Sequence, residues 1–232
     1  MRRYAILGML SLAASSAWAQ QATPPGDTTA TPATAPVQPS KAVVPMEEPQ
    51  PGDHWTYEVR DEISGTISAT RTNVITEVTP TAISTRVDNL GKPDPGQIVF
   101  DRFWNMTLSG IWRYSPNDGS GVQLPLTVDK TWTFRTNNIN SANGNIWKRS
   151  GKSTVAGQET ITTRAGTFET FKIETTFSAQ NVNNPTLKND VTSVTWYAPA
   201  IDHWVKRTFV SRTNKHLVIN NTIELIDYGR KQ

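Results

Sequence analysis

The amino-acid sequence predicts an all-β protein built of antiparallel sheets, and three observations point to this fold. Apolar and polar residues alternate over many short stretches after residue 52, as expected of strands that are buried on one face. No stretch there repeats apolar residues at the i, i+3, i+4, i+7 spacing of a buried helix face. Threonine, which favours strands over helices, occurs 32 times.

The predicted strands follow one another with short turns between them. Alternation is clearest in Trp55, Tyr57 and Val59, in Trp132 and Phe134, in Phe171, Ile173 and Phe177, and in Leu217, Ile219, Ile223 and Leu225. Further strands are predicted near residues 66–78, 82–88, 97–104, 109–115, 146–163, 191–198 and 203–211. Turn-forming sequences such as Asn89-Leu90-Gly91 and Ala165-Gly166 separate them. We expect Gly166 to take a positive φ and to close a short hairpin.

The predicted β domain covers residues 53–232 and contains an internal similarity. Asp53 precedes the strand that starts near Trp55, and Asp129 precedes the strand of Trp132 in the same way. We therefore predict two similar units, residues 53–125 and 126–232, whose antiparallel sheets form a sandwich or an incomplete barrel. Alternation along their strands points Trp55, Trp132 and Trp196 toward the core.

The first 52 residues predict export and a linker. Residues 1–19 combine Arg2 and Arg3, an apolar run and the small-residue pattern Ala17-Trp18-Ala19, which is typical of a signal peptide cleaved near Ala19. The apolar run is shorter than the ~20 residues of a membrane span, so we expect no transmembrane segment and a periplasmic or secreted bacterial protein. Residues 20–52 hold eight prolines and predict a disordered Pro/Thr/Ala-rich linker. This linker is either a spacer or a remnant without a role.

Charge and cysteine content exclude several classes of protein. The chain has 23 Lys and Arg against 20 Asp and Glu, a net charge of +3. Removal of Arg2 and Arg3 leaves 21 against 20, or +1, without the basic excess that nucleic-acid binding requires. Cysteine is absent, which excludes disulfides, thiolate nucleophiles and a lipid anchor built on cysteine.

Two segments carry a family resemblance. Ala165-Gly166-Thr167-Phe168 and Trp196-Tyr197-Ala198-Pro199 resemble a group of secreted bacterial domains of unknown function, close to family 3108. The resemblance is good over residues 120–228 and loose over residues 52–115. Arg164 stands where that family usually has proline. The resemblance implies an antiparallel sheet or open barrel and brings no established activity with it.

The sequence predicts no catalytic residue, no cofactor site and no metal site. His54, His203 and His216 are too far apart for a metal motif. Because His54 and His203 each precede a tryptophan, we expect both to face solvent on their strands. Gly119-Ser120-Gly121 has the composition of a turn, unlike a nucleophile elbow, and no pair of carboxylates is placed for acid–base catalysis.

The aromatic residues give the one candidate site. Both faces of the strands around residues 100–114 carry aromatic side chains, more than one core face requires. We therefore predict a ligand or partner surface at Phe103, Trp104, Trp112 and Tyr114. The function predicted from these features is an exported, non-enzymatic protein of the bacterial envelope that binds a partner protein or a ligand.

Two alternatives remain open. One is a carrier of an apolar ligand or lipid in an open β barrel, which a large cavity near Trp104 and Trp112 would favour. The other is an enzyme whose site is assembled from loops, which a cleft containing His203 with Asp202 or another carboxylate would favour.

Overall fold

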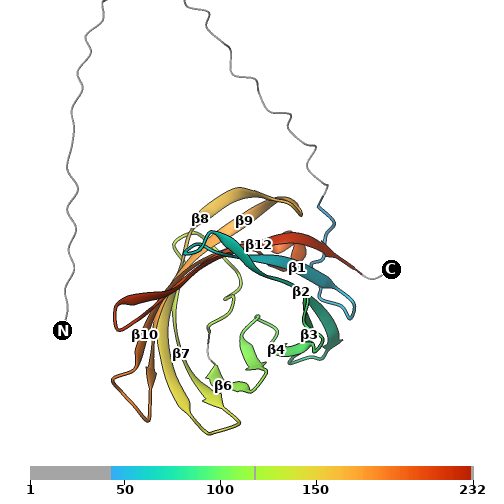
Figure 1. Cartoon of the computed structure of the whole chain (residues 1–232). Coiled ribbons are helices and arrows are strands. Elements are labelled where there is room, and N and C mark those ends of the chain that lie inside the picture. The colour runs from blue at the N-terminus through green and yellow to red at the C-terminus, as the bar shows by residue number, and fades with distance from the viewer. Residues whose placement is uncertain (1–42, 118, 231–232) are drawn as a thin grey trace, which may run out of the picture. The chain divides into compact units, whose positions relative to one another are not determined.

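The computed structural model describes residues 43–117 and 119–230. The predicted signal peptide, its cleavage near Ala19 and most of the predicted linker lie outside these residues. No helix in the described part of the chain has the length and apolarity that a membrane crossing needs. The elements (Figure 1) are β1 (His54–Asp61), β2 (Thr66–Val78), β3 (Ile83–Asn89), β4 (Gly96–Phe100), β5 (Met106–Ser109), β6 (Trp112–Asn117), β7 (Thr131–Asn140), β8 (Ile146–Thr163), β9 (Gly166–Asn181), β10 (Lys188–Ala198), the 3-10 turn η1 (Pro199–Ile201), β11 (His203–Thr213) and β12 (His216–Gly229).

The strands form one closed barrel. Each strand pairs antiparallel with the next one in the sequence, and β1 pairs with β12 to close the ring. That last pairing runs from His54 opposite Gly229 to Asp61 opposite Asn221. The predicted all-β antiparallel fold is confirmed. The finer expectation, a sandwich or an incomplete barrel, is met only in part, because the strands form a complete barrel. Side-chain alternation reveals strands but carries no signal about which edge strands meet.

The two predicted units contribute six strands each to this barrel. Residues 53–125 contain β1 to β6, with strands of 4 to 13 residues, and residues 126–232 contain β7 to β12, with strands of 10 to 18 residues. They do not form separate sheets, because β6 pairs with β7 as β12 pairs with β1. The wall of the barrel is therefore taller on the side of the second unit.

Most predicted strands lie close to their expected places, but the predicted strand 97–104 ends early and β5 was not predicted. β4 ends at Phe100, and the chain turns before β5 begins at Met106. The carboxylate Oδ1 of Asp101 accepts hydrogen bonds from the backbone N–H groups of Phe103 and Asn105, both at 2.9 Å, and so holds this turn. Gly166 has φ +147°, as the predicted hairpin requires.

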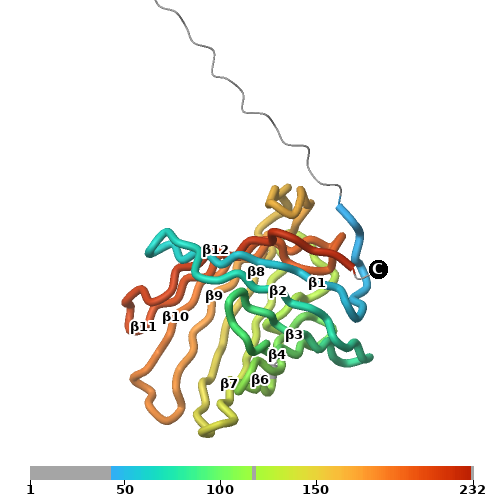
Figure 2. The backbone as a smooth tube through the Cα atoms, turned by 45° about the vertical axis from the view of Figure 1, so that its right-hand side comes forward, coloured from blue at the N-terminus to red at the C-terminus, as the bar shows by residue number. Residues whose placement is uncertain are grey.

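The two ends of the barrel differ. At one end, which we call the mouth, lie the tips of the hairpins that join β1–β2, β3–β4, β5–β6, β7–β8, β9–β10 and β11–β12. The other end, the closed end, is filled by an apolar cluster that includes Met46, Trp55, Ile83, Phe168 and Ile201. Figure 2 shows the β7–β8 and β9–β10 hairpins reaching away from the segment that begins at residue 43.

That segment, residues 43–52, packs against the closed end. Met46 is buried, and its N–H donates to the carbonyl oxygen of Ala200 at 2.8 Å. The guanidinium of Arg230 binds the buried carboxylate of Asp53 through two hydrogen bonds of 2.8 and 3.0 Å. The packed part of the chain therefore includes the last residues that the sequence assigned to the linker.

The long β8–β9 hairpin adds a second layer over part of the wall. It arches across β1 and β12 in Figure 1, where Arg164 at its tip forms an ion pair with Glu58 of β1. Glu159 of β8 accepts a hydrogen bond from the indole N–H of Trp196 at 2.5 Å, on the outer face of β10. Trp196 therefore lies on the outer face of β10 beneath this hairpin, half-buried and packed against the closed-end cluster, so its predicted core position is met only in part.

The other two tryptophans expected in the core differ in burial. Trp55 is 1 % exposed and lies in the closed-end cluster, as predicted. Trp132 is only half-buried, and its indole N–H donates to the carbonyl oxygen of Gly119 at 2.7 Å. Trp55 and Trp132 start equivalent strands of the two units but are not equally buried. Trp132 is covered only by the loop after β6, whereas Trp55 lies inside the closed-end cluster.

Candidate functional site: a closed-ended cavity inside the barrel

The barrel encloses a cavity of about 650 Å³, within the range of roughly 300–1,000 Å³ that is usual for small-molecule sites. Its wall consists of the inward positions of the strands, since every second residue of a strand faces the interior. β9 shows the pattern plainly, with Ile173, Thr175, Phe177 and Ala179 all lining the cavity. The wall is thus mixed, with aromatic and aliphatic side chains among hydroxyl and amide groups.

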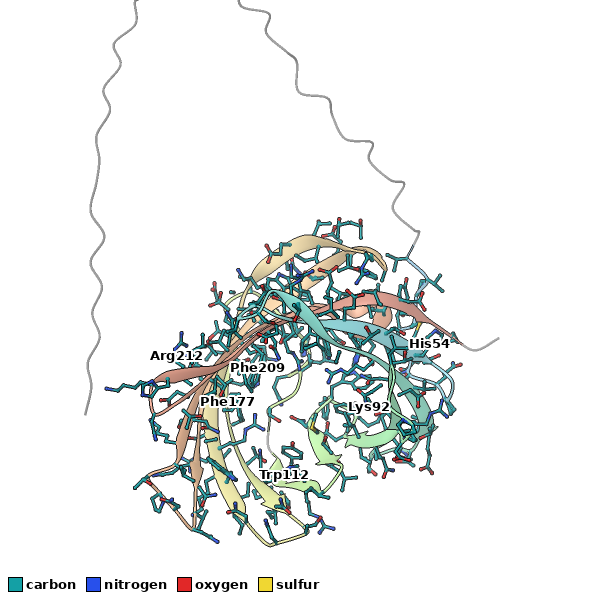
Figure 3. The ribbon with its side chains drawn as sticks, in the orientation of Figure 1. His54, Lys92, Trp112, Phe177, Phe209 and Arg212 are labelled. Atoms are coloured by element: carbon teal, nitrogen blue, oxygen red, sulfur yellow. The ribbon has the colours of Figure 1, made fainter. Side chains whose placement is uncertain are left out.

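The cavity reaches the mouth of the barrel. Trp112 and Trp147, which line it, lie at the start of β6 and β8 and therefore directly behind hairpin tips. Figure 3 shows Trp112 at the bottom of the ring of strands and Phe177 and Phe209 on its left side, while Arg212 projects outward. The hairpin tips also carry exposed apolar side chains, among them Ile63, Leu90, Ile111, Leu187 and Leu217. A ligand approaching at the mouth would thus meet apolar surface first.

At the closed end the cavity stops at a cluster of rings. The ring of His203 lies 4.4 Å from that of Trp55 and 4.5 Å from that of Trp104, measured between centroids. Tyr57 stacks on Trp204 at 3.9 Å and donates its hydroxyl hydrogen to the carbonyl oxygen of Trp204 at 2.9 Å. These contacts seal the barrel below the segment of residues 43–52.

His203 is only 3 % exposed, so its predicted solvent-facing position is wrong. It lies on the same parity of β11 as the buried Val205 and Ser211, while its neighbour Trp204, which the sequence placed inward, is only half-buried. Burial, together with the positive charges of Arg207 and Arg71, lowers the pKa of His203 to about 3. The ring is therefore neutral near pH 7. His54, by contrast, is partly exposed, with Nε2 3.7 Å from the Asp227 carboxylate.

The turn at residues 101–105 and the loop after β6 support the ring of Trp104. Trp104 has φ +59°, a conformation that is strained for a bulky residue and is typical of functional sites. Gly121 packs so closely on this turn that an added Cβ would lie 2.3 Å from the carbonyl oxygen of Phe103. Its N–H donates to Oδ1 of Asn105 at 2.5 Å, and that of Val122 to the Phe103 carbonyl at 2.8 Å.

Three arginines face the cavity: Arg71 on β2, Arg149 on β8 and Arg207 on β11. Burial lowers the pKa of all three guanidinium groups, that of Arg207 to about 10. Among the described residues that line the cavity there is no Asp or Glu, and no described carboxylate forms an ion pair with any of the three. The interior therefore carries a positive charge that the described wall does not balance.

Several polar atoms of the wall lack partners. The buried Nε of Arg71 and of Arg149 and the Oδ1 atoms of Asn73 and Asn138 form no hydrogen bond. Buried polar groups are nearly always satisfied in proteins, so such a group is expected to bind water or a ligand. All four residues line the same cavity. Its interior therefore offers unpaired hydrogen-bonding atoms to the polar group of a ligand.

Aromatic rings hold two of the arginines in place. The guanidinium carbon of Arg207 lies 4.6 Å from the ring centre of Trp204, and Nε of Arg207 donates to Oγ1 of Thr195 at 3.0 Å. The guanidinium carbon of Arg149 lies 4.2 Å from the ring centre of Phe177. Such cation–π contacts stabilise a guanidinium that has lost its water. They leave edge N–H groups available to a bound acceptor.

The structure brings together three of the four predicted site residues. Trp104, Trp112 and Tyr114 line the cavity from the closed end to the mouth. Phe103 is 51 % exposed, lies on the turn before β5 and is not among the lining residues. Whether these residues bind a ligand or a partner stays a prediction.

Sequence reasoning missed the three arginines and the inward position of His203. A signal for the arginines was present, because Arg207 lies two residues from both Val205 and Phe209 and so shares the parity of apolar neighbours. A charged residue on the apolar parity of a strand indicates either a buried ion pair or a cavity.

A second, outer hollow contains Asp202. It is lined by residues such as Leu126, Phe171 and Tyr197, and the Tyr197 hydroxyl donates a hydrogen bond to the Asp202 carboxylate. Burial raises the pKa of Asp202. His203 lines the inner cavity instead, so the two residues expected to meet in one cleft of an enzyme face different spaces. Within the described residues no cluster of three or more His, Cys, Asp or Glu is placed to hold a metal ion.

Solved structures share the fold. A protein of Parabacteroides distasonis, described as a lipoprotein, matches with a TM-score of 0.52 and 12 % identity, over 81 % of this chain and 100 % of its own. An exported protein of Bacteroides fragilis with a YmcC-like fold matches with a TM-score of 0.51 and 16 % identity, over 78 % and 97 %. The hypothetical lipoprotein YmcC of Escherichia coli is similar over 78 % of this chain and 87 % of its own, with a TM-score of 0.48 and 10 % identity.

The chain matches none of the curated proteins. A family model does match, and it covers the loop after β6 together with most of the second unit. The resemblance predicted from the sequence is thus confirmed there: residues 116–211 match the family described as DUF3108-like.

Proposed function

We propose that this chain is a non-enzymatic protein of the bacterial envelope that carries an apolar ligand inside its barrel. The observation that carries the proposal is the cavity of about 650 Å³, which is sealed by packed rings at one end and reaches the hairpin tips at the other. Rings from well-separated strands of the wall, such as Trp112 on β6 and Phe209 on β11, face it. A pocket of this size, in which aromatic and aliphatic side chains converge with placed polar groups, is typical of small-molecule binding.

The envelope location is supported by two similar structures, since one is described as a lipoprotein and the other as an exported protein. The predicted signal peptide agrees with them. A non-enzymatic role is supported by the state of His203, which is neutral near pH 7 and packed between Trp55 and Trp104. A general acid or base needs a pKa near the working pH and contact with its substrate.

The test is binding of N-phenyl-1-naphthylamine, a neutral dye whose fluorescence rises in apolar surroundings. We expect the full chain to bind it, and the variant Ala179→Trp, which places a ring in the cavity, to bind about tenfold less. Thr176→Trp is the matched control, because Thr176 is exposed on the outer face of the same strand. Binding that is absent, or equal in both variants, would contradict the proposal, provided that circular dichroism shows both variants folded.

A further inference from the structure

The interior charge is concentrated near the closed end. Arg71 lies opposite Tyr57 in the β1–β2 pairing, directly behind the ring cluster, and Arg207 follows His203 by four residues on β11. Both guanidinium groups interact electrostatically with Tyr57. The positive charge of Arg71 also lowers the pKa of Arg207. We call Arg71 and Arg207 the inner pair. Arg149 lies apart from them, four residues beyond Asn145 in the β7–β8 hairpin tip and stacked on Phe177.

Two buried guanidinium groups without a carboxylate partner are unfavourable inside a protein. Burial of an unpaired charge costs several kcal/mol, and repulsion between like charges adds to this. Buried arginines are normally matched by a carboxylate, yet the described lining offers none, and Nε of Arg71 has no partner. Tyr57, whose pKa burial raises far above neutral pH, is uncharged and does not compensate. An anion that enters through the mouth would supply the partner that the described lining lacks.

We propose that the inner pair binds the anionic head group, a carboxylate or a phosphate, of an amphipathic ligand whose apolar chain extends toward the mouth. The inference rests on the proposed function and specifies its ligand. Guanidinium groups suit both anions, because each presents parallel N–H donors to two oxygen atoms. Beyond the inner pair, Phe177, Phe209 and Trp112 supply apolar wall toward the mouth. The ligand thus enters with its head group first.

The test is displacement of N-phenyl-1-naphthylamine from the full chain by four competitors: hexadecanoate, hexadecyl phosphate, hexadecanol and inorganic phosphate. We expect the two acids to compete about 10- to 100-fold better than the alcohol, the range that charge-assisted hydrogen bonds provide. Inorganic phosphate, assayed also by calorimetry, should bind at least about tenfold more weakly than hexadecyl phosphate because it lacks the chain. Equal binding would show a site for free anions and would overturn the amphipathic ligand.

Variants locate the head group. Arg71→Gln and Arg207→Gln should each reduce the advantage of acid over alcohol, measured as a ratio within the same variant, by about tenfold. Arg149→Gln is the matched control from the same cavity and should keep that advantage. Arg71→Gln should also leave the urea midpoint unchanged or raise it, because an unpaired buried cation is removed; a large loss would indicate a structural arginine instead.

The outcomes separate the two proposals. If the dye binds but acid and alcohol compete equally, the apolar carrier stands and the anion site is wrong. If only Arg149→Gln removes the preference, the head group lies near the mouth and the inner pair is not its site. If the dye and all four competitors fail to bind, the proposed function and this inference are both overturned.

Discussion

The closed end and the mouth of the barrel contain the same kinds of side chain in different arrangements. At the closed end, Trp55 and His203 are almost fully buried and in contact, and the Tyr57 hydroxyl has a backbone partner. Toward the mouth, Trp112 and Tyr114 are half-buried on a cavity wall, and Nε of Arg149 lacks a hydrogen bond. Aromatic content therefore does not distinguish core from cavity in this molecule. Burial does, whereas unpartnered polar atoms occur at both ends, for example Nε1 of Trp55 at the closed end and Nε of Arg149 toward the mouth.

The largest effect expected from this contrast concerns Trp55. Trp55→Ala should lower the free energy of unfolding by about 3–5 kcal/mol, because it removes a ring that fills the closed end and leaves a cavity against Trp104 and His203. Urea unfolding at pH 7 measures the change. A loss below about 1 kcal/mol would show that the closed end repacks freely, and the contrast between the two ends would disappear.

The next effect is a pH dependence that originates at His203. Its folded-state pKa of about 3 lies below the ordinary value of 6.5, so between these values the unfolded chain binds a proton that the folded chain excludes. Stability should therefore fall as the pH drops below 6.5, by about 2 kcal/mol at pH 5 for this residue.

Comparison of variants isolates that contribution. His203→Gln cannot be protonated, so its stability should change less between pH 7 and pH 5 than that of the unmodified chain. His54→Gln, at a partly exposed position, serves as the control and should retain most of the change. An identical pH dependence in the unmodified chain and His203→Gln would place the buried histidine ring in solvent, contrary to the structure.

A third effect tests the wall between the two ends. Gly151 of β8 lies between Phe134 and Phe177, whose rings are 6.0 Å apart, and an added Cβ would lie 2.5 Å from the Phe177 Cβ. Gly151→Ala should therefore cost about 1–3 kcal/mol through overpacking. Gly157→Ala in the same strand, where nothing lies within 4 Å of an added Cβ, should change stability by less than about 0.5 kcal/mol. If urea unfolding shows the same loss of stability for both variants, the side chains around Gly151 move to accommodate the added methyl group, and the prediction is wrong.

The sequence predicts much of this architecture, because local alternation and turn residues carry the information. Strands such as β2 and β8 begin and end where expected, and three of the four aromatic residues chosen for a site line the cavity. The inward arginines and His203 were missed because their environment is formed by strands distant in the sequence. Arg71, for example, is buried only once β12 has closed the ring beside β1.

The same limit explains Trp132 and Trp196. Each lies on a strand with suitable alternation, but the β8–β9 hairpin folds over Trp196 on the outer face, and the loop after β6 covers only part of Trp132. Alternation assigns two faces to a strand without saying which face points inward. It also does not reveal a second layer that covers the outside of a barrel.

The smallest stability effect is expected at Trp112, and it distinguishes a wall residue from a core residue. Trp112 lines the cavity near the mouth and is half-buried at the start of β6. Trp112→Ala should change the free energy of unfolding by less than about 1 kcal/mol, because its ring faces a cavity where few packed neighbours are lost. Binding of N-phenyl-1-naphthylamine should weaken by about 1–2 kcal/mol, or roughly 5- to 30-fold, because a large apolar contact is removed.

The comparison with Trp55→Ala makes this result decisive. Urea unfolding and dye titration of both variants should give opposite patterns, in which Trp55→Ala loses stability and Trp112→Ala loses affinity. Arg113→Ala, at the neighbouring exposed position, controls for disturbance of β6 and should leave both quantities nearly unchanged. If Trp112→Ala costs as much stability as Trp55→Ala, then the mouth is packed like the closed end. An apolar ligand would in that case have no passage into the barrel.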